Sequence, residues 1–280
     1  MFSRAILISL VAVLVFTTQH SIAQKELSGD QVVTFDTRPG VKQSVLILEP
    51  KGPIMGVVLM FPGHEGVVRF VKTNDGYEVE TEGGGFTAQK TARETFRDNG
   101  LVAAVIAPPT GMERGLDTIF RSSKEHTTDI VQVISYLRQK YGKNPILHGH
   151  CRGTFSPASI ATHLKNDGIG GLILTSPRSK GRWGAVTDYD ADVVNVPVLL
   201  VQHTQDTCPG TLYRMLDQVI DFYKRSSKKV DVILVTGGNG KDRGDNCQNG
   251  YHSFAGLQKE TATAIAGWVL ERDFPRSIRD

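Results

Sequence analysis

Residues 149–153, Gly-His-Cys-Arg-Gly, place a thiol at the centre of a glycine-flanked pentapeptide. The spacing matches the G-x-S-x-G motif, in which a sharp turn between a strand and a helix presents a nucleophile, with sulfur here in place of oxygen. The short apolar run Pro145–Leu147 precedes the pentapeptide, and residues 154–161 after it are compatible with a helix. Such a turn strains its middle residue and admits only small residues on either side, which the two glycines supply. A thiol at Cys151 would also lie at the amino end of a helix, where the helix dipole favours the thiolate.

The pentapeptide alone does not distinguish a reactive thiol from a structural one. Free cysteines are often small buried hydrophobic residues, and short motifs of this kind also occur by chance. A cysteine that attacks an acyl carbon needs a base that takes its proton and a further group that orients the base. The rest of the chain must therefore offer both groups at suitable places.

An aspartate and a histidine follow two later apolar runs. Asp206 comes after the run 196–201, and His252 lies in the long loop after the run 230–235. Each has a second interpretation, because Asp206 could cap a helix that begins near Thr211 or shape a turn, and His252 could be an ordinary loop histidine. The competing acids precede the strand at 196–201 and are expected to form a polar turn: Asp188, Asp190 and Asp192.

Apolar segments of strand length alternate with segments of helical periodicity. Runs such as 56–61 are typical of strands covered on both faces, and residues 125–141 carry apolar side chains at helical spacing. The alternation predicts an α/β fold with a mostly parallel sheet and helices on both of its faces. Functional residues of such sheets lie on loops beyond the carboxyl ends of the strands. We expect strands at 31–35, 44–48, 56–61, 101–106, 145–147, 171–174, 196–201 and 230–235, and helices at 87–99, 125–141, 154–164, 212–224 and 260–273.

The chain resembles an α/β-hydrolase over nearly all of its length after residue 23. Residues 149–153 resemble the nucleophile turn of that family, 198–209 the strand and loop that present its acid, and 250–254 the loop that presents its histidine. A cysteine in place of the serine is similar to the dienelactone hydrolases, which use a Cys-His-Asp triad on this fold. The resemblance implies a nucleophile, a base and an orienting acid in Cys151, His252 and Asp206, and it implies no substrate.

In this family two backbone N–H groups hold the oxyanion that forms during the reaction. One is expected from Arg152, directly after the nucleophile. The other is expected from residues 62–64, Pro-Gly-His, which resemble the family's His-Gly-x turn, and the N–H of His64 is the candidate. The side chain of His150 is expected to point away from the site.

The domain is expected to run from residue 24 to 280 without a large lid, because the segment 177–193 is short. That segment and residues 67–85 would cover the substrate pocket. Residues 67–85 are polar and glycine-rich without a clear period, and we predict a loop there. Four residues of the segment 177–193 could receive an anionic, partly aromatic substrate, or could be solvated charges on a loop: Arg178, Lys180, Arg182 and Trp183.

The chain has three cysteines. If Cys151 is the nucleophile, Cys208 and Cys247 are left to form a disulfide. The bridge would join the loop that carries the acid to the loop that carries the histidine. We expect it to hold the three catalytic groups in place.

The amino terminus has the pattern of an export signal. Arg4 supplies a positive charge, residues 5–16 form an apolar run that is short for a membrane span, and small residues precede a cleavage point after Ala23. The alternative is an uncleaved anchor. With cleavage, residues 1–23 are removed and the protein is periplasmic or secreted.

The whole chain has 280 residues and a formal net charge of +3, too small to indicate a nucleic-acid partner. No metal or organic cofactor is implied, and the expected partner is a small acyl substrate. The sequence therefore predicts an exported hydrolase that cleaves an ester, lactone or thioester. Two alternatives stay open: a non-catalytic binding protein of the same fold in which Cys151 is inert, and an acyltransferase or peptidase that uses the same triad.

Overall fold

The computed structural model describes residues 29–74, 76–83, 85–181, 184–239, 247 and 250–280. The predicted export signal, residues 1–23, lies outside the described residues, as do Arg182 and Trp183. In chain order the strands and helices are β1 (Gln31–Arg38), β2 (Val41–Leu48), β3 (Gly56–Phe61), β4 (Val68–Thr73), β5 (Gly76–Thr81), α1 (Lys90–Asp98), β6 (Leu101–Ile106), α2 (Thr118–Arg121), α3 (Lys124–Tyr141), β7 (Ile146–His150), α4 (Phe155–Leu164), β8 (Gly171–Thr175), β9 (Val198–His203), α5 (Leu216–Lys224), β10 (Val230–Thr236), α6 (Gln258–Val269) and β11 (Ser277–Arg279).

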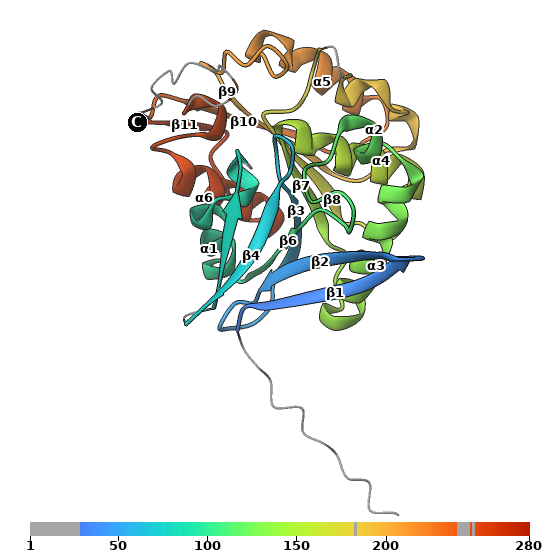
Figure 1. The fold of residues 1–280 in the computed structure, drawn as a ribbon. Helices are drawn as coiled ribbons and strands as arrows, with labels where there is room; N and C mark the ends of the chain where they lie inside the picture. Colours follow the sequence, from blue (N-terminus) through green and yellow to red (C-terminus); the bar gives the residue numbers. More distant parts are fainter. Residues whose placement is uncertain (1–28, 75, 84, 182–183, 240–246, 248–249) are drawn as a thin grey trace, which may run out of the picture.

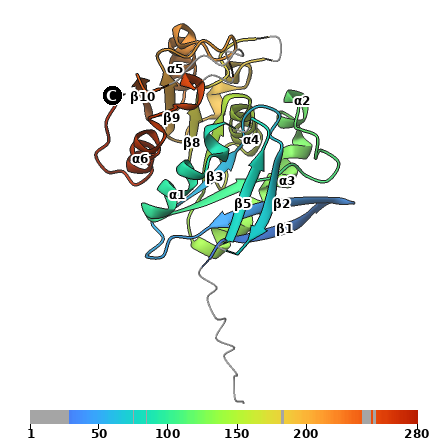
Figure 2. The same ribbon diagram turned by 60° about the vertical axis from the view of Figure 1, so that its left-hand side comes forward.

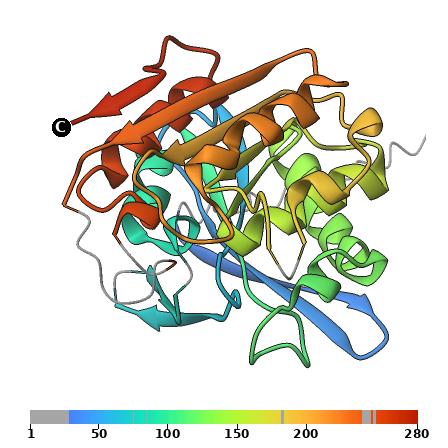
Figure 3. The ribbon, with the colours of Figure 1, turned by 90° about the horizontal axis from the view of Figure 1, so that it is seen from above.

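Among the described residues, the main sheet has nine strands in the order β1-β2-β6-β3-β7-β8-β9-β10-β11. Strands β1 and β2 form an antiparallel hairpin, and β2 is antiparallel to β6. From β6 to β11 every neighbouring pair is parallel. Helices cover both faces, with α1 and α6 on one side and α3, α4 and α5 on the other (Figures 1 and 3). The predicted α/β fold with a mostly parallel sheet is confirmed.

Alternating side chains of the strands feed two separate hydrophobic cores. In β3, Val57, Leu59 and Phe61 pack with the face covered by α3 and α4, whereas Val58 and Met60 pack with the face covered by α1 and α6. All five are at most 1% exposed, as expected for a central strand of a parallel sheet. The sheet is thus a buried, rigid platform for the loops at its carboxyl edge.

Helix α3 shows how local sequence sets an element's ends. The Ser123 side chain accepts a hydrogen bond from the backbone N–H of His126, which caps the amino end. Gly142 adopts a left-handed conformation at the carboxyl end, where a side chain would be strained. Between these ends the apolar positions Ile130, Val133 and Leu137 are fully buried. The helix predicted at 125–141 is therefore confirmed to within one residue.

The prediction of a loop at residues 67–85 is wrong for most of that segment. Strands β4 and β5 pair there as an antiparallel hairpin, separate from the main sheet (Figure 2). Three apolar side chains pack against the core on the α1 and α6 side: Phe70, Tyr77 and Val79. The residues next to them in the strands, such as Arg69 and Glu80, are exposed. This one-sided burial stabilises a ribbon even though its overall composition is polar.

The segment between β8 and β9 contains only short 3₁₀ turns among its described residues, Val186–Asp188 and Ala191–Val193. The expectation of no large lid holds for the described part of the chain. None of the described helices combines the length and the apolar character that crossing a bilayer requires.

Candidate active site

Cys151 lies on a strained turn between β7 and α4. Its φ is +51°, in the left-handed region that residues with a side chain rarely adopt. A Cβ on Gly149 would lie 2.5 Å from the carbonyl oxygen of Gly153, and a Cβ on Gly153 would collide with the carbonyl of Phe61. Because these obstacles are backbone atoms, both positions require glycine. The structure therefore gives the pentapeptide the sharp strand-to-helix turn that its sequence predicts.

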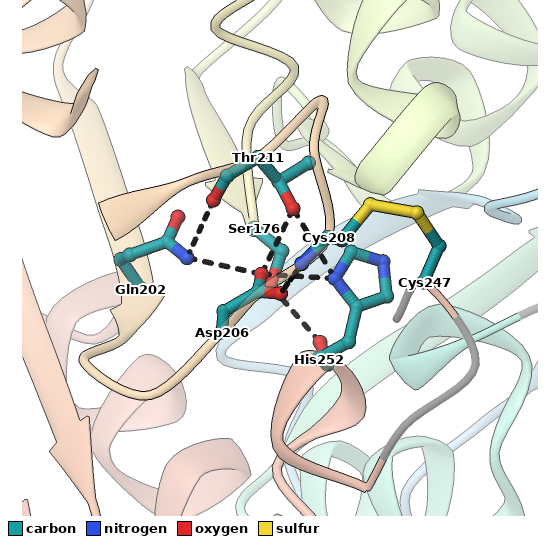
Figure 4. Close-up of a disulfide and its surroundings, with 7 residues drawn as sticks. All are labelled: Ser176, Gln202, Asp206, Cys208, Thr211, Cys247 and His252. Carbon is teal, nitrogen blue, oxygen red and sulfur yellow. Dashed lines mark hydrogen bonds and ion pairs between the residues drawn. A yellow bond between two sulfur atoms is a disulfide. The ribbon is translucent and has the colours of Figure 1, made fainter. Parts of the chain in front are cut away.

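Asp206 and His252 meet at the carboxyl edge of the sheet. His252 Nδ1 lies 2.9 Å from Asp206 Oδ2, and both side chains are buried (Figure 4). Asp206 follows β9, and His252 lies in a short 3₁₀ turn, Tyr251–Ser253, after β10. The loop histidine and the acid that the sequence singled out are thus in direct contact. Asp188, Asp190 and Asp192 instead bond locally or to Arg225.

The carboxylate of Asp206 is held by four donors. Besides His252, its Oδ2 accepts from the side chains of Gln202 at 3.1 Å and Thr211 at 2.9 Å. Its Oδ1 accepts from the backbone N–H of Cys208 at 2.9 Å, so Asp206 also shapes the turn, as its second interpretation proposed. The hydrogen bond from Ser176 Oγ to the backbone carbonyl of His252, at 3.0 Å, fixes the other end of the pair.

Cys151 lies beside His252. The sulfur of Cys151 and a ring nitrogen of His252 lie within 4.8 Å of each other. Burial raises the pKa of the Cys151 thiol, but the nearby His252, Arg178 and the backbone N–H of Arg152 lower it, and the net pKa is lowered. The structure therefore brings together all three residues of the predicted constellation.

The imidazole of His252 holds its proton strongly. Burial lowers the pKa of His252, but the charges of Cys151 and Asp206 and hydrogen bonds to both raise it to about 10. The neighbouring ring of His150 stays neutral, because burial and the charge of His252 keep its pKa well below the ordinary value. Together these effects favour an ion pair of Cys151 thiolate and His252 imidazolium at neutral pH.

His150 departs partly from expectation. Its Nδ1 is 3.1 Å from the hydroxyl of Thr175, so it bonds nearby as expected. Its ring does not point away from the site, because its centroid lies 5.0 Å from that of His252. The ring of His150 thus packs against the imidazole of His252.

The two segments expected to supply the oxyanion N–H groups are tied together. The side chain of Arg152 forms an ion pair with Glu65, the residue after His64. The buried guanidinium of Arg121 donates to the carbonyl of Pro62 at 3.1 Å. A Cβ on Gly63 would lie 3.5 Å from the Cβ of Cys151, so this loop lies against the nucleophile turn.

Arg178 is not a solvated charge on a loop, which was one of its two expected roles. Its side chain is buried, with 7% of the residue exposed, and its guanidinium packs against Gly210 and Gly181. Burial lowers the pKa of Arg178, and the neighbouring charge of Cys151 raises it. Lys180, two residues on, is exposed as expected. Sequence analysis named Arg178 as a residue that could receive an anionic substrate, but it did not predict that this charge is buried near the sulfur.

Cys208 and Cys247 form a disulfide between the acid loop and the histidine loop (Figure 4). Cys151 is the free cysteine. The group of Cys151, Cys208 and His252 has the composition of a metal site, with one donor atom of each within 4.8 Å of the others. Since the Cys208 sulfur is bonded to Cys247, only two good donors remain, fewer than protein zinc sites use.

Neither a family model nor a sequence among the curated proteins matches this chain. Several solved structures, in contrast, do match this chain. An α/β serine hydrolase homologue from Coxiella burnetii superposes with a TM-score of 0.56 at 16% identity, covering 84% of this chain and 96% of that one. The chain has an α/β-hydrolase fold.

Two further structures of this fold give the same result. A serine hydrolase without a lid from Xanthomonas campestris has a TM-score of 0.57 at 13% identity and covers 86% of this chain and 96% of its own. A thermostable carboxyl esterase from Bacillus coagulans has a TM-score of 0.56 at 12% identity, with 86% and 99% covered. At such identities the likeness concerns the α/β-hydrolase fold alone, and the chemistry must be argued from the residues of this chain.

Proposed function

We propose that this protein is a hydrolase that cleaves a carboxylic ester, lactone or thioester through Cys151, His252 and Asp206. The observation that carries the proposal is the placement of His252 between the carboxylate of Asp206, at 2.9 Å, and the sulfur of Cys151. A nucleophile, a base and a group that orients the base are the three parts that acyl transfer requires.

In the first half of the reaction the Cys151 thiolate attacks the acyl carbon. The oxyanion accepts hydrogen bonds from the backbone N–H groups of Arg152 and His64. The tetrahedral intermediate collapses, the bond to the leaving group breaks, and the leaving alcohol takes the proton of His252. The acyl group is then held on Cys151 as a thioester.

In the second half His252 changes its role. Once Cys151 is acylated, the thiolate charge that raises the pKa of His252 is gone, while burial continues to lower that pKa. The neutral imidazole can then take a proton from water, which attacks the thioester and releases the acid. Asp206 keeps the Nδ1 side of the ring fixed through both halves.

Arg178 favours acyl substrates that carry a negative charge. Its guanidinium is buried near the Cys151 sulfur, and its Nε has no hydrogen-bond partner among the described residues. The positive charge of this guanidinium would attract a substrate carboxylate that lies near the sulfur. We expect a nitrophenyl ester of a dicarboxylic acid to react with a higher kcat/KM than the neutral acetate ester, and Arg178→Gln to remove that preference.

The test of the activity is a screen of nitrophenyl esters, lactones and peptides with the wild type, Cys151→Ala and Cys151→Ser. We expect hydrolysis by the wild type, and a loss of roughly 10⁴-fold or more in Cys151→Ala. Cys151→Ser should be weaker than the wild type, because a hydroxyl is a far weaker acid than a thiol. A mass increase on residue 151 during turnover would identify the acyl intermediate. Unchanged hydrolysis in Cys151→Ala would refute the proposal.

The same screen separates the alternatives. An acyltransferase would release more product when an alcohol acceptor is added, and a peptidase would cleave the peptides. A non-catalytic binding protein would turn over none of the substrates, and its Cys151 would react with alkylating reagents no faster than an ordinary thiol.

A further inference from the structure

Besides the acyl carbon of a substrate, the sulfur of Cys151 has a disulfide sulfur within its reach. The sulfurs of Cys151 and Cys208 and a ring nitrogen of His252 all lie within 4.8 Å of one another. Cys208 is fully buried and Cys151 is 6% exposed, so water has little access to the space between their sulfurs. The Cys208 sulfur is bonded to Cys247, and a disulfide sulfur is the atom that thiolates attack in exchange reactions.

We propose that Cys151 exchanges with the Cys208–Cys247 disulfide, so that Cys208 is a site of reversible modification by the nucleophile. The Cys151 thiolate donates an electron pair to the Cys208 sulfur, and a Cys151–Cys208 bond forms. The Cys208–Cys247 bond breaks, and its electron pair leaves on Cys247. Cys247 takes a proton from water, and His252, which has lost its ion-pair partner, releases one. One thiol and one disulfide exist before and after, so no oxidant or reductant is consumed.

The surroundings select Cys208 as the atom attacked. The backbone N–H of Cys208 donates to Asp206 at 2.9 Å, so the loop that orients His252 also positions this sulfur. Cys247, in contrast, is half-buried. A leaving sulfur at that place can reach solvent, whereas the attacking and attacked sulfurs remain inside.

The exchanged form has no nucleophile. With its sulfur bonded to Cys208, Cys151 cannot be acylated, a consequence that rests on the proposed hydrolase function. The form also protects the sulfur, because a disulfide is reversible whereas the higher oxidation products of a thiolate are not. Return attack by Cys247, or a small thiol, restores the active form.

The test traps the sulfur that the exchange releases. The purified, oxidised wild type is incubated with a maleimide that carries a long polymer, which is too large to reach buried Cys151 but can reach a released Cys247. Trypsin then places the three cysteines in separate peptides, 144–152, 183–214 and 244–259. We expect the polymer on 244–259 and a disulfide between 144–152 and 183–214. Polymer on 144–152, or no polymer with the original disulfide intact, would overturn the proposal.

Cys151→Ser is the matched control. It lacks the attacking sulfur, so we expect no polymer and an intact link between 183–214 and 244–259. Labelling of 244–259 in this variant would show that the disulfide opens without Cys151, which contradicts the proposal.

Cys247→Ser gives a second, independent measurement. It leaves Cys208 free beside Cys151, and oxidised glutathione should convert the two thiols into the Cys151–Cys208 disulfide. A lasting mixed disulfide with glutathione would count against the proposal. The peptide link between 144–152 and 183–214 is read without any activity assay. A protein that forms it but hydrolyses no ester refutes only the hydrolase function, and one that hydrolyses esters without it refutes only the exchange.

Discussion

Cys151 and His252 share a proton whose position depends on the charges around them. Burial acts against both charged forms, yet the pKa of Cys151 is lowered and that of His252 is raised to about 10. Each partner stabilises the charge of the other, while Asp206 further stabilises the imidazolium and Arg178 the thiolate. The pair is therefore an ion pair over a pH window that ends where His252 loses its proton.

The pH dependence of alkylation measures this window. The rate of Cys151 labelling by iodoacetamide should rise with the thiolate fraction and level off below the pH at which an ordinary thiol would. Ester hydrolysis should fall above about pH 10, because His252 then lacks the proton that the leaving alcohol needs. Arg178→Gln removes a positive charge near the sulfur and should move the labelling midpoint to higher pH. A wild-type midpoint at or above that of a free thiol would contradict the ion pair.

At this scale, the contact between Asp206 and His252 could be predicted from their positions after strands. Asp206 and His252 could be placed because both follow strands at the carboxyl edge of a parallel sheet. Gln202 offered a further signal, a polar residue that ends the apolar run of β9 and lies four residues before the acid. The burial of Arg178 could not be predicted, because it depends on how the loop at 177–181 folds against Gly210 from a distant segment.

At the scale of the elements, the nucleophile turn depends on glycines whose neighbours are backbone. Gly149→Ala or Gly153→Ala should lower the free energy of unfolding by about 1–3 kcal/mol or more, because the obstructing carbonyls cannot move aside as side chains can. Gly52→Ala is the control, since a Cβ there meets no atom within 4 Å. Urea denaturation of the three variants provides the measurement. Equal midpoints for Gly149→Ala and Gly52→Ala would show that the turn tolerates a side chain.

The disulfide closes a long loop between the acid and the histidine. Its cysteines are 39 residues apart, and the loss of such a cross-link costs about 3–4 kcal/mol when it acts by restraining the unfolded chain. The double variant Cys208→Ser with Cys247→Ser should unfold at lower urea, and its kcat should fall because the loop of His252 is less restrained. An unchanged unfolding midpoint would mean that the bridge is structurally dispensable.

The β4–β5 hairpin shows where composition misleads. Its strands are rich in charged residues, yet apolar residues recur at every second position in parts of both, as in Val68 and Phe70 or Tyr77 and Val79. The period of two was present, but the glycines and charges around it obscured the pattern. The strands of the main sheet were predictable because burial on both faces requires long apolar runs such as that of β3.

At the scale of the whole molecule, we propose that the protein is exported and then processed. The proposal rests on Arg4, the apolar run 5–16 and the small residues before Ala23. When the full gene product is expressed in a bacterium, we expect the periplasmic or secreted form to begin at Gln24, as read by amino-terminal sequencing. Recovery of an intact amino terminus in the membrane fraction would instead support the uncleaved anchor.

The layered architecture could be predicted from the sequence, but the edge strand β11 could not. Alternating strands and helices predict a parallel sheet between two helical layers, because consecutive parallel strands need crossovers. The pairing of β11 with β10 was not foreseen, since its three residues, Ser277–Arg279, carry one apolar side chain and give no periodic signal. Short edge strands are defined by the neighbour they meet rather than by their own composition.

The separation of the interior into two cores, one on each face of the sheet, has a consequence for engineering. Leu137 of α3 and Phe96 of α1 are both fully buried but belong to different cores with the sheet between them. Substitutions at sites without shared partners combine by simple addition. The losses of Leu137→Ala and Phe96→Ala should therefore sum in the double variant to within about 0.5 kcal/mol, as urea titrations can measure. Stabilising changes could then be selected on each face in parallel libraries and merged without a further round of screening.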